Sequence, residues 1–209
     1  MILGLEKMSN YLETRVIGQR RSRARADSGA SLPLTTMLKT RPAVLPDVEH
    51  IHTIIEPYAR EGTLLPRSIA EISENVRDFV VAEQEERILG CGALHLYGTH
   101  LAEIRSIAVS ENSKGHGIGR ALVQALLEES WRHSVTCVCL FTRVPRFFAH
   151  LGFEIARRDM LPDKIYKDCV YCPRLMDCDE VAMVKGKIPE NNDGLRDPLI
   201  SIPLVQIKA

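Results

Sequence analysis

The sequence predicts a single α/β domain with a central mixed sheet flanked by helices. Runs of β-branched and aliphatic residues alternate with amphipathic helical segments, as they do in proteins of this class. A buried strand over residues 101–109 leads into a glycine-rich turn that opens a helix. A second, short helix begins at Pro145 and ends at Gly152 before another strand. The 209 residues, 45% of them hydrophobic, suffice for a real core.

Before residue 100 the chain is expected to form a strand, two helices and a hairpin. Residues 40–44 read as the first strand, and Asp47 as the N-cap of the first helix. Ser68 and Glu71 have the spacing of a capping box, which opens a second helix with Ile69 facing the core. The expected hairpin strands are residues 79–82 and 88–97.

After residue 100 strands and helices alternate. In the expected strand 135–142, Cys137 and Cys139 share one face and read as core residues. The other expected elements are a strand over residues 101–109, a helix from Ile118, a short helix over 146–151, a strand from Phe153 and a last strand over 179–185.

The glycine-rich turn at residues 114–119 is the main functional signal. Its glycines allow successive backbone N–H groups to point into one concavity, which the N-terminus of the following helix extends. We interpret the turn as a cradle for a pyrophosphate. No Gly-Lys-Ser/Thr follows, and the glycine spacing differs from the dinucleotide-binding fingerprint. Alternatively, the glycines only make a tight connection between strand and helix.

Composition argues against several classes of partner. Lysine plus arginine and aspartate plus glutamate number 27 each, so the formal charge is zero and no nucleic acid is expected. No apolar run is long enough for a membrane span. Six cysteines without a secretory signal indicate a cytoplasmic protein with reduced thiols.

One group of cysteines leaves alternatives open. Cys169, Cys172 and Cys178 offer three of the four ligands that a structural zinc site usually requires. A redox-sensitive pair is a second alternative, and inert thiols are the default. We expect no metal.

Three segments are expected along the chain, of which one is a folded domain. Residues 1–36 hold six basic and three acidic side chains without periodicity, which predicts a disordered basic extension. The extension reads as a solvated tail, a transit peptide or the result of an early start codon, because Met37 precedes the first strand. The folded domain spans residues 37–188, and a loose tail of residues 189–209 follows it.

The turn and the short helix together resemble the GNAT acetyltransferases. Lys114, Gly117 and Gly119 match that family's Arg/Gln-x-x-Gly-x-Gly/Ala loop, with Lys as the cation. Residues 147–153, a short helix ending in Gly-Phe, are similar to its second signature. The resemblance implies the GNAT fold and acetyl-CoA as co-substrate. The implied cofactor-binding residues are Ile107, Ala108, Val109, Lys114, Gly115, His116, Gly117, Ile118, Gly119 and Arg120.

Four segments are similar, in the same order, to the acetyltransferase domain of N-acetylglutamate synthase. They are residues 64–68, 103–109, 140–153 and 161–164. The resemblance implies a short, stand-alone enzyme that transfers acetyl from acetyl-CoA to the α-amino group of L-glutamate, in arginine synthesis. Alternatives are a GNAT enzyme for another small amine or a protein N-terminus, and a non-catalytic acyl-CoA-binding module. A homodimer stays open.

The resemblance also implies roles for individual residues. Two parallel strands, residues 104–109 and 138–142, would separate to hold the acetyl-pantetheine arm. Glu103 occupies the place of the family's general base. Phe148 stands where many members have a tyrosine that protonates the leaving thiolate, so that acid is absent. The expected glutamate-binding residues are Arg67, Arg105, Ser106 and Lys164, with Arg143 as an alternative to Arg105, since a second carboxylate requires cations.

Overall fold

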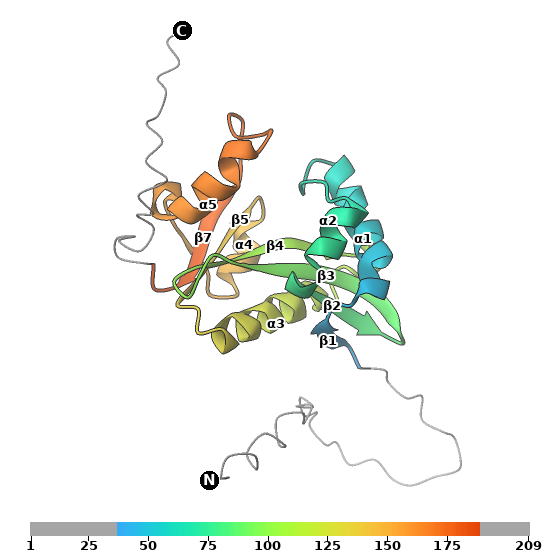
Figure 1. Ribbon diagram of the computed structural model, residues 1–209. Helices are drawn as coiled ribbons and strands as arrows, with labels where there is room; N and C mark the ends of the chain where they lie inside the picture. Colours follow the sequence, from blue (N-terminus) through green and yellow to red (C-terminus); the bar gives the residue numbers. More distant parts are fainter. Residues whose placement is uncertain (1–36, 189–209) are drawn as a thin grey trace, which may run out of the picture. The chain divides into compact units, whose positions relative to one another are not determined.

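The computed structural model describes residues 37–188, which form one mixed sheet with helices on both faces (Figure 1). The sheet has seven strands in the order β1-β2-β3-β4-β5-β7-β6, and β4 with β5 is its parallel pair. The expected fold class is thereby confirmed. The strands are β1 Lys39–Pro42, β2 Phe79–Gln84, β3 Arg87–Leu96, β4 Ala102–Val109, β5 Cys137–Thr142, β6 Glu154–Ile155 and β7 Val181–Gly186.

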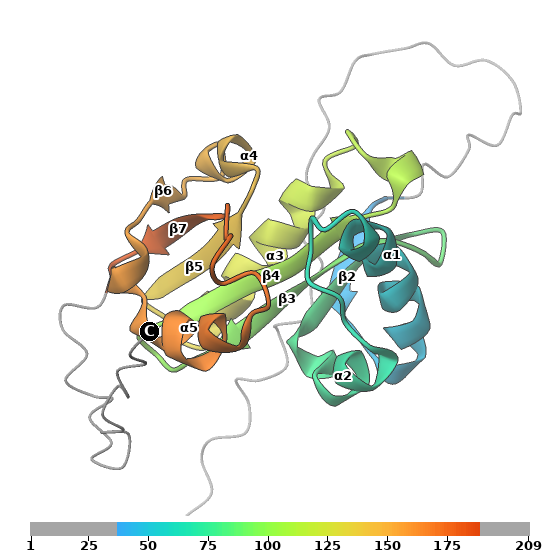
Figure 2. The ribbon, with the colours of Figure 1, turned by 90° about the horizontal axis from the view of Figure 1, so that it is seen from above.

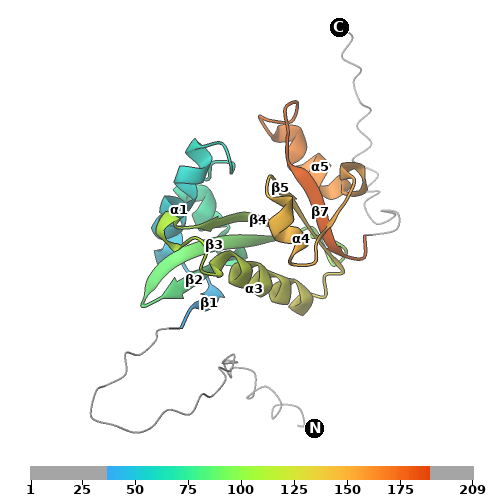
Figure 3. The same ribbon diagram turned by 180° about the vertical axis from the view of Figure 1, so that it is seen from behind.

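Helices cover the two faces unequally. The longest, α3 (Ile118–Arg132), lies against one face with the short α4 (Pro145–Ala149), whose Phe148 joins the same apolar cluster (Figures 1 and 3). The opposite face carries α1 (Val48–Arg60), α2 (Ile69–Glu74) and α5 (Pro162–Lys167). Seen from above, α5 lies on the β5 and β7 side of that face and α1 with α2 on the β2 and β3 side (Figure 2).

Strand β4 changes its alternation at Ser106. Glu103 and Arg105 point to the face of α1, α2 and α5, and Ile104 packs in the core under α3. Ser106 has φ +56°, and the β3–β4 register shifts beside it, between Cys91 and Ala93. Ile107 therefore returns to the α3 face one position later than a regular strand would allow.

The glycine opposite this bulge makes room for it. A Cβ on Gly92 would lie 2.4 Å from Cδ1 of Ile107, which is closer than carbon atoms approach. Any larger residue there would displace the end of the Ile107 side chain.

The parallel pair β4–β5 is short. Only Ala102 with Val138 and Glu103 with Cys139 are partners, although both strands continue for several residues. Beyond Glu103 the two strands separate, so the backbone of residues 104–109 loses its β5 neighbour. The gap implied by the family resemblance is therefore present in the fold.

Several local expectations were wrong. Asp47 is the N-cap residue of α1, as expected, but its side chain makes no capping hydrogen bond, because Arg41 and the Val44 N–H already occupy its carboxylate. Ile69 lies at the start of α2 and is 49% exposed. Strand β1 ends at Pro42, and β5 and β7 each begin two residues later than expected. Helix α5 was not foreseen. The Ser68 cap is confirmed, since its side chain accepts a hydrogen bond from the Glu71 N–H.

Two of the expected segments lie outside the described residues. They are the extension of residues 1–36 and the tail of residues 189–209, and both stay predictions.

The Asp47 carboxylate ties β1 to the start of α1 and gives a test of the fold. Arg41 binds it with two nitrogens, at 2.7 and 3.0 Å, and the same guanidinium also reaches Glu83 of β2. The hydrogen bond from Arg41 outweighs burial and lowers the pKa of Asp47 in the folded state. The stabilisation is thus present at neutral pH and is lost as the pH falls through the folded pKa.

We therefore predict that Asp47→Asn lowers the free energy of unfolding at pH 7 by about 2–4 kcal/mol. The difference from wild type should shrink as the pH falls from about 4, the ordinary pKa of an aspartate, through the lowered pKa of folded Asp47. Urea denaturation across this pH range measures both effects. Glu49→Gln, an exposed change in the first turn of α1, is the control. An equal loss in both variants would refute this role.

Candidate functional site

A cavity of about 580 Å³ lies in the gap between β4 and β5. This volume is in the range of small-molecule sites. Its walls are mostly apolar and come from both separated strands, the loop before α3, α4 and the end of α1. The β-strand residues lining it are Ile104, Arg105, Ser106, Ile107, Ala108, Val109, Leu140, Phe141 and Thr142.

The glycine-rich loop forms one end of this cavity. Gly115 and Gly117 both have φ +81°, and a Cβ at either position would meet no atom within 4 Å. The glycines are therefore required by backbone conformation, and the space beside them is open. Gly117 is the N-cap of the 15-residue α3, so the first free N–H groups of that helix face the same region. Such an arrangement suits phosphate oxygens.

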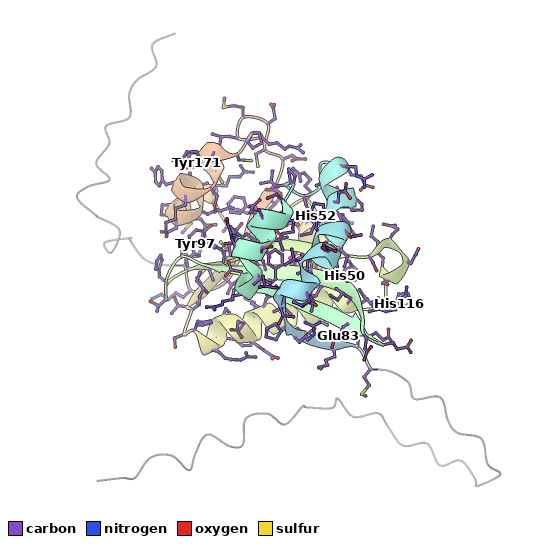
Figure 4. All side chains as sticks on the ribbon, turned by 45° about the vertical axis from the view of Figure 1, so that its right-hand side comes forward. His50, His52, Glu83, Tyr97, His116 and Tyr171 are labelled. Atoms are coloured by element: carbon purple, nitrogen blue, oxygen red, sulfur yellow. The ribbon has the colours of Figure 1, made fainter. Side chains whose placement is uncertain are left out.

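Nine of the ten residues expected to bind the cofactor line the cavity, and His116 does not. His116 lies on the projecting loop at the right of Figure 4. The Lys114 ammonium pairs with Glu111 and lies 4.9 Å from the centroid of the Tyr58 ring. Tyr58 in turn donates a hydrogen bond to the Val109 carbonyl, which holds α1 against the end of β4.

A small recess adjoins the cavity and shares Arg105 and Ser106 with it. Arg67, just before α2, enters the recess and pairs with Glu71. Arg105 approaches His95 at 3.2 Å and Asp78 at 4.0 Å. The recess therefore contains two guanidinium groups, each already balanced by a carboxylate of the protein. Three of the four expected acceptor-binding residues meet here.

The fourth, Lys164, lies elsewhere and contacts Glu103. Its Nζ is 2.8 Å from Glu103 Oε1 and 3.3 Å from Asp168 Oδ2. The Tyr97 hydroxyl lies 3.0 Å from Glu103 Oε2 and 2.5 Å from Asp168 Oδ2. Tyr97 lies beneath the segment that carries Tyr171 in Figure 4. We call Glu103, Lys164, Asp168 and Tyr97 the polar cluster.

Charge and burial fix the protonation of this cluster. Burial opposes the charge on Lys164, but attraction to Glu103 and Asp168 outweighs it and raises the pKa. Burial likewise opposes the charge on Asp168, but the Tyr97 hydrogen bond and Lys164 lower the pKa below its usual value. Burial, with the nearby carboxylates, raises the pKa of Tyr97 far above its usual value. At neutral pH the lysine is therefore charged, the aspartate ionised and the tyrosine neutral.

Glu103 lies at the closed end of the gap without lining it. It belongs to the last β4–β5 residue pair, and its side chain is on the same face as that of Arg105. The residue is 3% exposed and is absent from the lining of both cavities. A proton from a molecule in the gap would therefore reach Glu103 through an intervening water or a small side-chain movement.

Phe148, where no proton donor for the leaving thiolate was expected, lies in apolar surroundings. Phe148 is buried, with its ring edge-on to Phe147 at 4.9 Å and to Phe153 at 5.9 Å. Phe147 lines the cavity beside it.

The cysteines are free thiols. Cys137 and Cys139 are fully buried in the core under α5, as expected, and burial raises the pKa of Cys137 to about 11. Cys169, Cys172 and Cys178 are partly buried. Within residues 37–188, no group of three or more His, Cys, Asp or Glu side chains is placed to hold a metal ion.

The sequence interpretation missed Tyr97 and Asp168. Pro162 at the first position of α5 is a recognised helix-start signal, and the spacing of Lys164 and Asp168 places them on one helical face. Those two signals could have revealed the helix and its charged pair. No local pattern points Tyr97 toward Glu103.

No described helix is long and apolar enough to cross a membrane.

Comparison with known proteins gives consistent results. The Acetyltransferase (GNAT) domain profile matches residues 75–155. An uncharacterized N-acetyltransferase of Chlorobaculum tepidum is 42% identical over 145 residues, which are 69% of this chain and 94% of that protein. An amino-acid acetyltransferase of Mycobacterium tuberculosis is 37% identical over 110 residues, 51% of this chain and 63% of that one. The chain spans only about a third of the Neisseria meningitidis amino-acid acetyltransferases it matches.

Solved structures have the same fold. A Mycobacterium tuberculosis protein in complex with CoA and NLQ superposes with a TM-score of 0.61 and is 28% identical, covering 71% of this chain and 99% of that one. The N-acetylglutamate synthase of Neisseria gonorrhoeae, complexed with CoA and N-acetyl-glutamate, has a TM-score of 0.66 at 24% identity, over 74% of this chain and 36% of that one. The profile, the Chlorobaculum relative and the separated parallel strands agree, and the chain belongs to the GNAT family of N-acetyltransferases.

Proposed function

We propose that the protein transfers the acetyl group of acetyl-CoA to the α-amino group of L-glutamate. The observation that carries the proposal is the recess with Arg67 and Arg105, which adjoins the gap between the separated strands. A glutamate acceptor brings two carboxylates, and guanidinium groups are suited to bind them. The amino-acid acetyltransferases among the relatives support the same class of acceptor.

Acetyl-CoA is the acyl donor, as in the GNAT family. The residues present fit it, because the open glycine loop and the start of α3 suit its pyrophosphate, and the apolar gap suits its pantetheine arm. Residues 107–109 would then offer backbone N–H groups to the thioester carbonyl, whose oxygen gains negative charge as the amine attacks. We retain the ten expected cofactor-binding residues as a proposal, with His116 the least favoured of them.

The acceptor amine must lose a proton before or during attack, because an α-amino group is largely protonated at neutral pH. We assign this proton to Glu103, through a water, since the carboxylate lies at the closed end of the gap. The Lys164 ammonium contacts both oxygens of the Glu103 carboxylate, at 2.8 and 3.0 Å. We therefore propose that Lys164 positions the Glu103 carboxylate instead of binding the acceptor carboxylate.

The leaving thiolate needs a proton, and Phe148 has none to give. We propose that water supplies it, because the described residues of α4 around the ring are apolar.

The first test concerns the cofactor loop. Gly117→Glu should abolish measurable CoA binding, because it adds bulk, a strained φ of +81° and a negative charge at the start of α3. Gly117→Gln has the same size and strain without the charge, so it should bind at least about tenfold more tightly than the Glu variant. Calorimetry with CoA measures both affinities, and the rise in melting temperature reports them independently. Wild-type affinity in both variants would exclude the loop as the phosphate site.

The second test concerns acceptor choice. Arg67→Ala should raise the KM for glutamate tens-fold or more and leave that for acetyl-CoA nearly unchanged, because losing a buried charge-assisted pair costs about 2–5 kcal/mol. Glu71→Gln frees the Arg67 guanidinium and should not weaken glutamate binding. Arg77→Ala, an exposed change nearby, is the control. Thiol release over a panel of amino acids should show a wide preference for glutamate over alanine. Equal rates on the two would refute glutamate specificity.

The third test concerns the base. Glu103→Gln should lower kcat at neutral pH by about 10²–10⁴-fold, with CoA affinity retained. The loss should shrink as the pH rises, because more of the acceptor amine then arrives unprotonated. The pH profile of kcat separates this from a folding defect. A rate within about twofold of wild type would show that another group takes the proton.

A further inference from the structure

A buried base has to return its proton to water after every turnover. Glu103 is 3% exposed, and the Lys164 ammonium contacts both of its carboxylate oxygens, at 2.8 and 3.0 Å. The acceptor and the acyl donor would cover the side toward the gap during the reaction. The proton therefore needs a path through the polar cluster.

The polar cluster contains one such path. The Tyr97 hydroxyl lies 3.0 Å from Glu103 Oε2 and 2.5 Å from Asp168 Oδ2, so it bridges the two carboxylates. Asp168 is at the C-terminal end of α5, and its side chain is 33% exposed. We propose that Tyr97 and Asp168 form a proton relay from Glu103 to solvent, which rests on the proposed role of Glu103 as base.

The transfer balances with one proton. The Glu103 carboxyl group gives its proton to the Tyr97 oxygen as the Tyr97 O–H proton moves to the Asp168 carboxylate. Asp168 releases that proton to water, and rotation of the tyrosine hydroxyl restores the starting state. No oxidant or other reactant is needed.

A hydroxyl suits this position better than the neighbouring ammonium. It accepts one hydrogen bond while it donates another, whereas Lys164 has donors only and holds its own proton because its pKa is raised. The pKa of Tyr97 is also raised, by burial and the two carboxylates, so the tyrosine passes a proton without becoming a phenolate. The lowered pKa of Asp168 favours rapid release of the proton to water.

Other charged groups around Tyr97 are placed differently. The Lys167 ammonium lies over the ring, 5.3 Å from its centroid, and the His95 ring packs edge-on at 4.9 Å. His95 Nδ1 faces Asp78 and Arg105. Arg105 lowers the pKa of Asp168 only at longer range, after Tyr97 and Lys164. None of these groups forms a hydrogen bond with the hydroxyl, which leaves Asp168 as its outlet among the described residues.

The test removes one hydroxyl. Tyr97→Phe should lower kcat by about tenfold or more in dilute buffer, while the KM values for acetyl-CoA and the acceptor change little. Added imidazole should restore the rate, because a small external base then carries the proton away. A purely structural role for Tyr97 would not respond to buffer. The assay follows CoA release with L-glutamate, or with the amino acid that the panel identifies. Tyr166→Phe, on the 70% exposed tyrosine of α5, is the control.

A second variant guards against a folding failure. Asp168→Asn keeps the shape of a partly exposed side chain but cannot take a proton, so it should show the same loss and the same rescue. The double variant should be no slower than Tyr97→Phe alone, because both lie on one path. Full activity of either single variant, or a loss that imidazole does not restore, would overturn the relay. If Glu103→Gln retains wild-type activity, the base assignment fails and the relay fails with it.

Discussion

The site depends on the parallel pairing of β4 and β5 ending after two residue pairs. A sheet normally satisfies its backbone groups by continuous pairing, and a gap within it leaves polar groups that another molecule must satisfy. Here the bulge at Ser106 turns β4 away from its regular course, and Gly92 leaves room for the displaced Ile107. The cavity is thus built from backbone geometry, and most of its lining surface is apolar.

Three cations near the gap are already paired within the protein. Arg67 contacts Glu71, Arg105 lies near Asp78, and Lys164 is shared by Glu103 and Asp168. Such pairs keep buried or half-buried charges from the cost of isolation. An anionic acceptor must therefore displace a protein carboxylate from its cation. A neutral acceptor has no charge with which to replace that carboxylate. This exchange gives a physical basis for discrimination by charge.

Helix α5 and the turn after it carry the residues that surround the proposed base, Glu103. The helix is only six residues long, and its packing rests on Leu161 and Asp163, both buried at its start. It brings Lys164 and Asp168 over the sheet next to Glu103, more than sixty residues away in the chain. A change in this short segment would alter the polar cluster without touching β4.

Local patterns in the sequence predicted the strand–turn–helix unit, the Ser68 cap and the alternation of side chains in strand β5, because each depends on near neighbours or on period. The order of strands and helices then predicted a central sheet flanked by helices. The family resemblance, rather than the spacing, supplied the gap between β4 and β5 and the position of Glu103. Tertiary structure decided what each charge contacts. Asp47 is a residue type that favours helix caps, yet Arg41 from strand β1 binds its carboxylate. Lys164 was expected beside Arg67 at the acceptor, but it contacts Glu103. The bridge of Tyr97 between Glu103 and Asp168 also depends on the fold, because contacts between residues far apart in the chain leave no periodic trace in the sequence.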